Sequence, residues 1–331
     1  MNINHISYIA DQIISGNPIT EEQAHLLAEL PAGDLPALFA GASRIREHFF
    51  GKRVSLCAII NAKSGLCPED CSFCAQSAHH NTTVDVYPLM DHDSILKSAK
   101  IAASSGAACF GIVTSGSGIR AGDELERLCD VIKSISLLEE IAPGASLGTL
   151  DQVSVDALKS AGLVTYHHNL ETARSFFPKI CTTHDYEDDV ATVRMAKQAG
   201  LRVCSGGLFG LGESMLQRVE LAFTLKELDV DSVPVNFLDP VAGTPLAGSV
   251  GISPLECLHT VAILRFILPD RHITICGGRE KNLRELQSWL FLAGASGMMT
   301  GNYLTKEGRQ PNADRQLIAD LGLELFEELV R

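Results

Sequence analysis

The sequence predicts an α/β fold, and within that class a closed (β/α)8 barrel of the TIM type behind an N-terminal helical extension. Short β-type runs alternate with amphipathic segments of helical length. Several helical segments end in Gly directly before a β-type run, as in "KSAGLVTYHH" (159–168) and "KQAGLRVCSGG" (197–207). Gly at a helix C-terminus supplies the left-handed turn from which a strand can begin. Strand–helix alternation indicates a parallel sheet, and eight repeats favour closure into a barrel. A doubly wound open sheet is the alternative on pattern alone.

The order of the elements follows from the same pattern. Residues 1–50 are expected to form the helical extension and residues 51–331 the barrel domain, with a closing helix at 312–330. Amphipathic helices, among them 123–140 and 253–268, separate the strands. No low-complexity linker interrupts the chain, so a single barrel is expected after the extension. The eight strands are expected at 54–60, 107–113, 145–149, 163–167, 201–206, 232–238, 272–277 and 296–300.

Composition excludes several classes of protein. The 331 residues are 46% apolar and 20% charged, which is typical of a globular chain, and the formal charge of -13 argues against a nucleic-acid partner. The N-terminus lacks the basic and apolar segments of a signal peptide. The most apolar stretch, "LHTVAILRFILP", is too short to span a bilayer and contains Arg265. A cytoplasmic protein with no membrane partner is expected.

Three cysteines lie close together in "AKSGLCPEDCSFCAQSAHH" (62–80), directly after the first expected strand. Active sites of such barrels lie at the C-terminal ends of the strands, so Cys67, Cys71 and Cys74 are expected there. Thiolates are ligands for iron–sulfur clusters and zinc. A structural zinc site needs four protein ligands, whereas a cubane cluster held by three cysteines leaves one iron open. The cluster is the better interpretation; a zinc site completed by Cys57, or unligated cysteines, are the alternatives.

The motif C-x3-C-x2-C, with Phe73 before its last cysteine, resembles the radical S-adenosylmethionine superfamily. The longer "SGLCPEDCSFCAQS" resembles the biotin synthase family within it. Further matches follow in family order and extend the resemblance over roughly residues 50–325. They are "LGTL" (147–150), "HHNLET" (167–172), "VCSGGLFGLGE" (203–213), "VPVNFL" (233–238), "GTPLA" (243–247) and "GGRE" (277–280).

The resemblance implies a [4Fe–4S] cluster whose open iron binds S-adenosylmethionine. One electron then cleaves the sulfonium to methionine and a 5′-deoxyadenosyl radical, which abstracts hydrogen from unactivated carbon. In this family the substrate is dethiobiotin, and a sulfur from an auxiliary iron–sulfur cluster, [2Fe–2S] in the family, bridges two carbons. The enzyme is thus a sulfurtransferase. An electron donor such as flavodoxin or ferredoxin and a homodimeric state are also implied.

The ligands of the auxiliary cluster depart from the family pattern. Cys109 and Cys204 match two of the three family cysteines, whereas the third position falls on Gly144 and the family arginine position on Thr274. Cys276 lies two residues beyond Thr274 and therefore on the same face of its strand. With Cys57 on the first strand, inward-pointing side chains can converge. We expect a second cluster of altered type held by Cys57, Cys109, Cys204 and Cys276; the alternative is that these cysteines are buried small hydrophobes.

Other site residues are implied by the same resemblance. The resemblance implies that S-adenosylmethionine lies beside Gly206 and Gly207, two glycines that permit close approach of the backbone to a ligand. Three polar residues, His167, Asn236 and Thr305, are expected to contact the substrate. His167 stands at a position where the family has asparagine. The residues expected to contact the cofactor are Phe73, Asn169, Glu171, Gly206, Gly207 and His184. Glu171 stands for a family aspartate and His184 for a family arginine. Cys129, Cys181 and Cys257 receive no role.

Two alternative functions stay open at the level of sequence. A related radical enzyme of the same subgroup, such as a hydrogenase cofactor maturase or an amino-acid mutase, keeps the first motif but need not keep "CPEDC", "VPVNFL" or the strand cysteines. A non-catalytic zinc- or cluster-binding module predicts no cleavage of S-adenosylmethionine. Turnover with dethiobiotin separates these readings.

Overall fold

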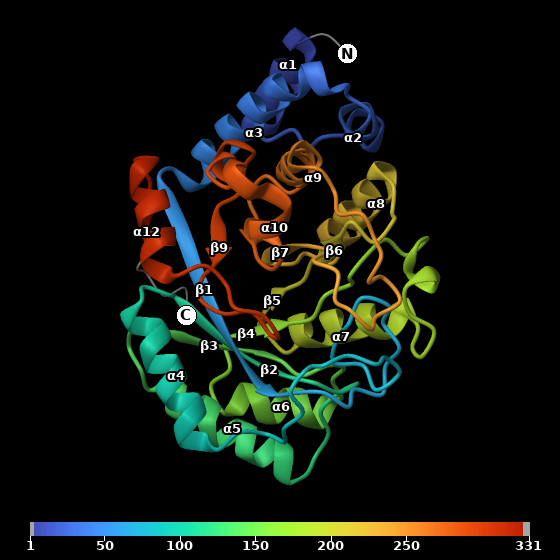
Figure 1. Ribbon diagram of the computed structural model, residues 1–331. Coiled ribbons are helices and arrows are strands. Elements are labelled where there is room, and N and C mark those ends of the chain that lie inside the picture. Colours follow the sequence, from blue (N-terminus) through green and yellow to red (C-terminus); the bar gives the residue numbers. More distant parts are fainter. Residues whose placement is uncertain (1–2, 327–331) are drawn as a thin grey trace.

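Parallel strands occupy eight positions and close into a barrel in the computed structural model, which describes residues 3–326 (Figure 1). Strand β1 pairs with β2 on one side and with β9 on the other, which closes the sheet. β5 and β6 both pair with β7 and together fill one of the eight strand positions. The barrel is therefore confirmed and the open sheet is excluded. The strands are β1 (Arg53–Lys63), β2 (Cys109–Thr114), β3 (Ala142–Ser146), β4 (Thr165–His167), β5 (Arg202–Cys204), β6 (Gly207–Phe209), β7 (Ser232–Phe237), β8 (His272–Ile275), β9 (Gly297–Met299) and β10 (Glu324–Leu325).

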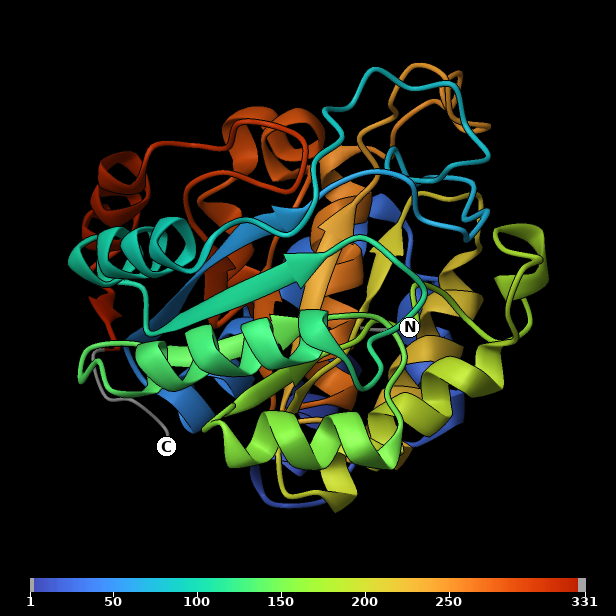
Figure 2. The same ribbon diagram turned by 90° about the horizontal axis from the view of Figure 1, so that it is seen from below.

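Helices cover the outside of the barrel, and the loop after β1 lies at one end of it, beside the loop after β7 (Figure 2). The barrel helices are α4 (His92–Ser104), α5 (Asp123–Ser136), α6 (Gln152–Ser160), α7 (Tyr186–Gln198), α8 (Met215–Glu227), α9 (Pro254–Ile267), α10 (Arg279–Leu283), α11 (Trp289–Leu292) and α12 (Pro311–Asp320). Short 3-10 turns lie at η1 (Ala32–Asp34), η2 (Phe177–Lys179) and η3 (Arg284–Leu286). No described helix is long and apolar enough to cross a membrane.

Three helices precede the barrel, as expected: α1 (Ile3–Ile14), α2 (Glu21–Ala28) and α3 (Leu35–Phe50). α2 begins with a capping box in which Thr20 and Gln23 satisfy each other's backbone N–H groups. α1 packs on α3, α2 packs on α8 and α9, and α3 packs on α9; the His259 ring bonds the Leu27 carbonyl oxygen at 2.8 Å. The division into a helical domain at 1–50 and a barrel domain at 51–331 stays a prediction.

The third strand lies three residues earlier than the sequence indicates, at Ala142–Ser146 in place of 145–149. Pro143 and Gly144 suggest a turn, yet both lie inside the strand. In a strand the nitrogen and the carbonyl oxygen of one residue point to the same side. The carbonyl oxygen of Pro143 accepts from Val164 N at 3.1 Å, so the nitrogen of Pro143 points to the same side, where the neighbouring chain precedes the first residue of β4. The missing N–H therefore breaks no ladder bond.

The predicted closing helix at 312–330 is also wrong in its extent. α12 ends at Asp320, because Gly322 adopts a left-handed φ of 66° and turns the chain into β10. β10 then pairs with the start of β1, Arg53 opposite Glu324. Residues 327–330 of the predicted helix lie outside the described part of the chain.

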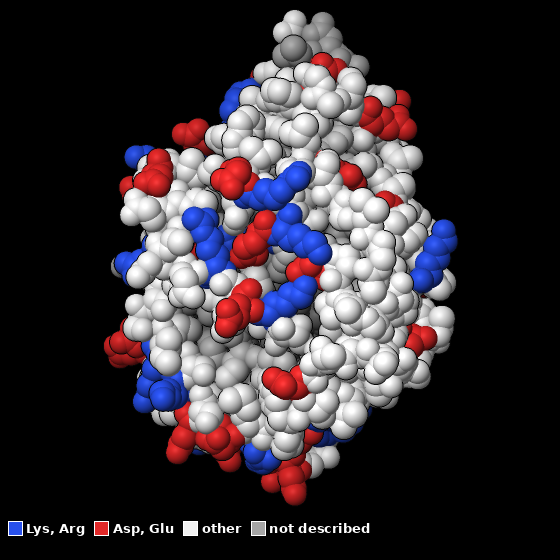
Figure 3. Space-filling model, viewed as in Figure 1, with Lys and Arg blue, Asp and Glu red and all other residues white. Residues whose placement is uncertain are grey.

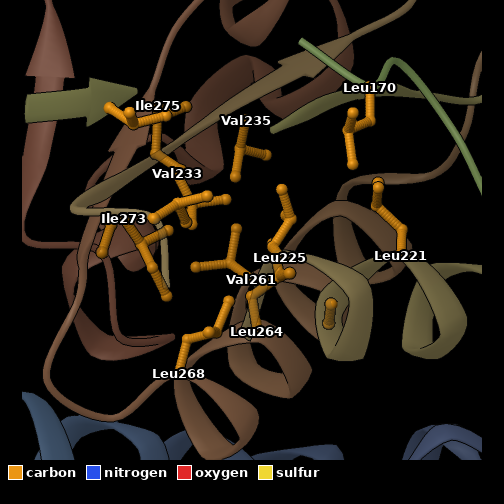
Figure 4. Packing of buried hydrophobic residues seen from close by; sticks show 14 of the residues in the cluster. Leu170, Leu221, Leu225, Val233, Val235, Val261, Leu264, Leu268, Ile273 and Ile275 are labelled. Atoms are coloured by element: carbon orange, nitrogen blue, oxygen red, sulfur yellow. The ribbon is translucent and has the colours of Figure 1, made fainter. Parts of the chain in front are cut away.

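A continuous apolar layer between barrel and helices holds the strands in place. Figure 4 shows this packing where β7 and β8 meet α8 and α9. Val233 and Val235 of β7 point outward onto Leu225 and Val261, all fully buried. Their neighbours in β7, Pro234 and Asn236, point into the barrel, as the period of two in a strand requires.

Arg265, which interrupts the most apolar stretch, is fully buried at the N-terminal ends of β8 and β9. Its guanidinium donates to the carbonyl oxygens of Gly294 and Pro269, each at 2.8 Å, and to Ser296 Oγ at 3.2 Å. The ring centre of Phe50 lies 4.7 Å from its Cζ. One cation thus joins α9 to the segments that start two strands.

Replacing Arg265 with Met is expected to lower the free energy of unfolding by about 3 kcal/mol, because several buried carbonyl groups lose their donor. Urea denaturation measures the change. Arg194→Met, at an exposed position of α7, is the matched control and is expected to leave stability within about 0.5 kcal/mol of wild type. Equal stability of both variants contradicts the proposed role.

Candidate active site

A cavity of about 580 Å³ occupies the barrel interior. Alternate strand residues line it, such as Cys109, Gly111 and Val113 in β2, while the residues between them point into the helical layer. Phe73, from the three-cysteine loop, lines the same cavity. The loop thus lies against the opening of the cavity.

The three-cysteine loop has a fixed backbone. Cys67 N donates to the Gln76 carbonyl oxygen at 3.0 Å, and Ala78 N donates to the Cys67 carbonyl oxygen at 2.8 Å. Cys74 N closes a turn onto the Cys71 carbonyl oxygen at 2.9 Å. All three thiols are half-buried, and burial raises the pKa of Cys74 to about 11. Because a metal cluster binds the thiolate form, its binding would displace these protons.

A second segment, residues 180–184, lies against this loop. Ser72 N donates to the Ile180 carbonyl oxygen at 2.8 Å. Thr182 N donates to the Asp70 carboxylate at 2.8 Å, and Asp70 N donates to Thr183 Oγ1 at 3.1 Å. The two segments are therefore joined on both sides of Cys71.

His184 is held between two carboxylates. Its Nδ1 lies 2.8 Å from Glu69 Oε2, and its Nε2 lies 3.4 Å from Asp189 Oδ2. Asp189 in turn pairs with His168 Nε2 at 2.8 Å. Hydrogen bonds to Asp189 and to Cys181 raise the pKa of His184 to about 11, so the ring carries a proton on each nitrogen. Both N–H groups already have protein acceptors. His184 therefore joins the loop to α7, and its expected contact with the cofactor stays a prediction.

Glu171 and Asn169 face each other at the end of β4. Asn169 Nδ2 lies 3.4 Å from Glu171 Oε2, and Asn169 Oδ1 accepts from Gly206 N at 3.2 Å. Glu171 has a left-handed φ of 61°, an uncommon conformation for a residue with a side chain. Burial, and then the nearby Asp189 carboxylate, raise the pKa of Glu171 to about 7. A carboxyl and an amide are thus directed into one polar corner of the cavity, as expected for a ribose contact.

The four cysteines expected at an auxiliary cluster all line the cavity. Cys57 is paired in register with Cys109 across β1 and β2. Cys276 directly follows β8. Its hydrogen bond with Cys57, together with burial, raises the pKa of Cys57. Burial and repulsion from the neighbouring thiolates raise the pKa of Cys109 and of Cys204 to about 12. Four thiols from four strand positions thus share one part of the barrel.

The two positions that lack a family ligand lie beside these thiols. A Cβ added at Gly144 would lie 3.2 Å from Cys109 Sγ, which shows that the glycine faces the thiol directly. Thr274 lines the cavity two residues before Cys276. Arg202 lies on β5 on the same face as Cys204, and its charge opposes the rise in the pKa of both Cys204 and Cys109. A cation therefore remains at this site, on a different strand from the family arginine.

His167, expected to contact the substrate, is half-buried and lines the cavity. It pairs in register with Cys204, and its Nδ1 lies 3.4 Å from Cys204 Sγ. Burial, with a further contribution from His168, lowers the pKa of His167 from its ordinary value of 6.5 to about 4. The ring is thus neutral at physiological pH.

The depressed pKa of His167 predicts a loss of stability in acid. Below pH 6.5 the unfolded chain binds a proton that the folded chain refuses until about pH 4. The free energy of unfolding therefore falls by about 2 kcal/mol from this group between about pH 7 and about pH 5. His167→Asn is expected to abolish that part of the loss. Urea denaturation of cluster-free protein at both pH values measures it.

The control for this prediction is the exposed His48 on α3. His48→Asn is expected to retain the acid sensitivity of wild type. A His167→Asn variant with the same pH profile as wild type would show that another group causes the loss.

Asn236 and Thr305 also line the cavity. Asn236 Nδ2 donates to the Gly207 carbonyl oxygen at 3.3 Å, and its Oδ1 accepts from Gly277 N at 3.0 Å. Lys and Arg side chains alternate with acidic side chains around a hollow on this face of the molecule (Figure 3). Among them, Asp239 lies between Lys281 and Lys306. The charges at this rim are largely paired.

Gly206 and Gly207 do not line the cavity. A Cβ at Gly206 would clash with the carbonyl oxygen of Pro234, and one at Gly207 would lie 2.5 Å from the carbonyl oxygen of Glu171. Packing between neighbouring strands therefore requires these glycines. The close approach of this backbone to S-adenosylmethionine stays a prediction.

Sequence reasoning missed the role of segment 180–184. Cys181 was given no role, and neither Glu69 nor Asp189 was singled out. In the structure Glu69, Cys181 and His184 bring their donor atoms within 4.8 Å of one another. The signal was the spacing Cys181-x2-His184 after a Pro-containing turn, which is weak because two such residues are common by chance.

A parallel barrel with a C-x3-C-x2-C loop at the end of its first strand defines a radical S-adenosylmethionine enzyme. In agreement, residues 63–225 match the radical SAM superfamily, and residues 234–324 match the biotin and thiamin synthesis associated domain. The chain is 66% identical to the biotin synthase of Trichlorobacter lovleyi over 98% of both chains. It is 60% identical to that of Geobacter sulfurreducens over 97% of this chain and 98% of the relative. The chain belongs to the biotin synthase family.

Solved structures agree on the fold. A methylornithine synthase superposes with a TM-score of 0.84 at 22% identity, covering 96% of this chain and 97% of that one. A maturase of the [FeFe]-hydrogenase superposes with a TM-score of 0.83 at 19% identity, covering 99% of this chain and 76% of that one. Identities this low support only the barrel. Family membership implies a [4Fe–4S] cluster, S-adenosylmethionine and an auxiliary cluster.

Proposed function

We propose that this chain converts dethiobiotin to biotin by radical sulfur insertion, as a biotin synthase of the sulfurtransferase class. The observation that carries the proposal is the presence of two thiol sets at one cavity: three on the loop at its opening and four on its wall. Radical cleavage alone needs only the first set. A second set inside the barrel is what a sulfur donor requires.

The first set fits a cubane cluster. Cys67, Cys71 and Cys74 supply three half-buried thiolates from a loop whose backbone bonds are already made. When bound, the cluster supplies the electron that cleaves the sulfonium of S-adenosylmethionine. Phe73 extends from this loop into the cavity and shields the reacting region from water.

The residues at the end of β4 suit the nucleoside part of the cofactor. Glu171 and Asn169 can accept from and donate to vicinal hydroxyls, and their mutual contact is long enough at 3.4 Å to be exchanged for a ligand. Gly206 acts indirectly, because its N–H orients the Asn169 side chain. His184 contributes by fixing Glu69 beside the loop.

The wall cysteines suit an auxiliary cluster of altered type. Cys57, Cys109, Cys204 and Cys276 supply four thiolates where the family uses three and an arginine. Gly144 faces Cys109 without supplying a ligand, and a Cβ there would lie only 3.2 Å from Cys109 Sγ. Soft thiolate ligands of this number select an iron–sulfur cluster or zinc, and sulfur transfer requires the former. The positive charge of Arg202 offsets part of the negative charge of the four thiolates.

The substrate is placed between the two thiol sets. Asn236 offers an amide for the ureido ring, and Thr305 at the rim offers a hydroxyl for the carboxylate. Neutral His167 directs its ring at the Cys204 side of the cavity. The proposal also includes an electron donor such as flavodoxin or ferredoxin, a homodimeric state and a cytoplasmic location. These three points rest on the family resemblance.

Anaerobic turnover with reconstituted protein, S-adenosylmethionine, a reductant and dethiobiotin tests the proposal. Biotin together with 5′-deoxyadenosine is the expected result. Cleavage without biotin favours a related radical enzyme, and absence of cleavage in protein with a full cluster excludes radical chemistry.

A further inference from the structure

A fourth thiol lies beside the three-cysteine loop. Cys181 Sγ is 3.8 Å from Cys71 Sγ, although 110 positions of sequence separate the two residues. In the described residues, neither Cys67 nor Cys74 makes a comparable contact with Cys71. Cys181 is buried and Cys71 is half-buried, so their contact is shielded from most solvent.

Hydrogen bonds flank the contact on both sides. The residue after Cys71 bonds the residue before Cys181, through Ser72 N and the Ile180 carbonyl oxygen. The residue before Cys71 bonds the residue after Cys181, through the Asp70 carboxylate and Thr182 N. These two bonds flank the thiol pair and fix its position, so the proximity does not depend on a chance rotamer.

The pair is also fixed from the helical side. His184 contacts Cys181 Sγ at 3.2 Å through Nδ1 and is held by Asp189 of α7 through Nε2. Glu69, on the loop of Cys71, accepts from the same Nδ1. The histidine thus bridges the loop and segment 180–184 beside the thiol pair.

We propose that Cys71 and Cys181 form a reversible disulfide in cluster-free protein. A covalent S–S bond needs about 2.05 Å, which the pair reaches by rotation of two side chains because the backbones are already adjacent. With a small-molecule disulfide as oxidant, one protein thiolate attacks it and releases one thiol. The second protein thiolate then attacks the mixed disulfide and releases the other. The protein loses two electrons and two protons, and the oxidant is reduced to two thiols.

The bond has two consequences for the cluster loop. Cys71 is occupied, so a cluster cannot load until a dithiol reductant reopens the pair. Cys71 is also kept from the sulfinic and sulfonic states, which are not recovered by thiols. This inference rests on the proposed role of Cys71 as a cluster ligand, but the pairing itself does not depend on the substrate.

Peptide mapping tests the pairing. Full-length protein is freed of iron by chelation, treated anaerobically with oxidised glutathione, alkylated and digested without reductant. Most of the protein is expected to yield a peptide that joins the segments of Cys71 and Cys181, and to bind iron and sulfide at the loop only after dithiothreitol. A Cys71–Cys67 or Cys71–Cys74 link, or a fully alkylated Cys71, overturns the proposal.

Two variants sharpen the test. In Cys181→Ser, Cys71 is expected to carry glutathione and to form no link to residue 181, whereas Cys129→Ser on α5 behaves as wild type. Oxidised wild-type protein that recovers iron binding at the loop without any reductant also contradicts the proposal. A wild-type protein that forms the link but loads no cluster after reduction supports the inference and counts against the proposed function, so the two failures are distinguishable.

Discussion

Cys74→Ala is expected to reduce formation of 5′-deoxyadenosine and of biotin by more than about 100-fold, and to remove about one cluster of iron per chain. A metal site commonly loses that much from changes outside its ligands, and here a ligand itself is lost. The loop retains two thiols, which cannot hold a cubane with a single open iron. Anaerobic reconstitution followed by iron and sulfide counts, with quantification of both products, measures the effect.

The matched control is Cys129→Ala, which removes a half-buried thiol from the outer helix α5. It is expected to retain full iron content and both products. If Cys74→Ala keeps wild-type cleavage of S-adenosylmethionine, the three-cysteine loop does not hold the catalytic cluster.

Cys276→Ala is expected to separate the two activities. The variant should keep the loop cluster and cleave S-adenosylmethionine, yet make biotin at least about 100-fold more slowly, because a wall ligand is missing. Iron and sulfide counts should fall by the content of the auxiliary cluster, and Mössbauer spectra should lose one of two components. Cys57→Ala on β1 is expected to behave in the same way.

Cys257→Ala provides the comparison for this prediction, since Cys257 is fully buried on α9 and lies outside the cavity. Its loss creates a small void and a modest loss of stability without any change in iron. An unchanged auxiliary cluster in Cys276→Ala and Cys57→Ala would remove both residues from the ligand set.

Periodicity was enough to predict the barrel, since all eight expected strands lie at the eight strand positions. Local signals placed β3 wrongly because Pro143 and Gly144 favour turns in isolation. Closure of the sheet overrides that preference: β2 pairs with Ala142–Ser146 over five successive residues. The run expected at 201–206 is confirmed over β5 (Arg202–Cys204), whereas β6 (Gly207–Phe209) lies beyond it.

The candidate site was predictable where strand geometry fixes side-chain direction. The period of two placed Thr274 and Cys276 on one face, and both line the cavity. Segment 180–184 was not predictable, because a loop has no period and its contacts depend on how α7 docks. His184 stands where the family has an arginine, and that substitution alone does not indicate that its ring nitrogens contact Glu69 and Asp189.

The length of β1 has a consequence for the chemistry. Its eleven residues, Arg53–Lys63, carry Cys57 near the middle and lead directly into the three-cysteine loop. At about 3.3 Å per residue, the rise from Cys57 to Lys63 is about 20 Å. One strand, β1, therefore connects Cys57 in the barrel wall to the three-cysteine loop. In the proposed function this strand sets the distance between the two thiol sets, and inserting one residue after Cys57 would reverse the face on which Cys57 lies relative to the loop.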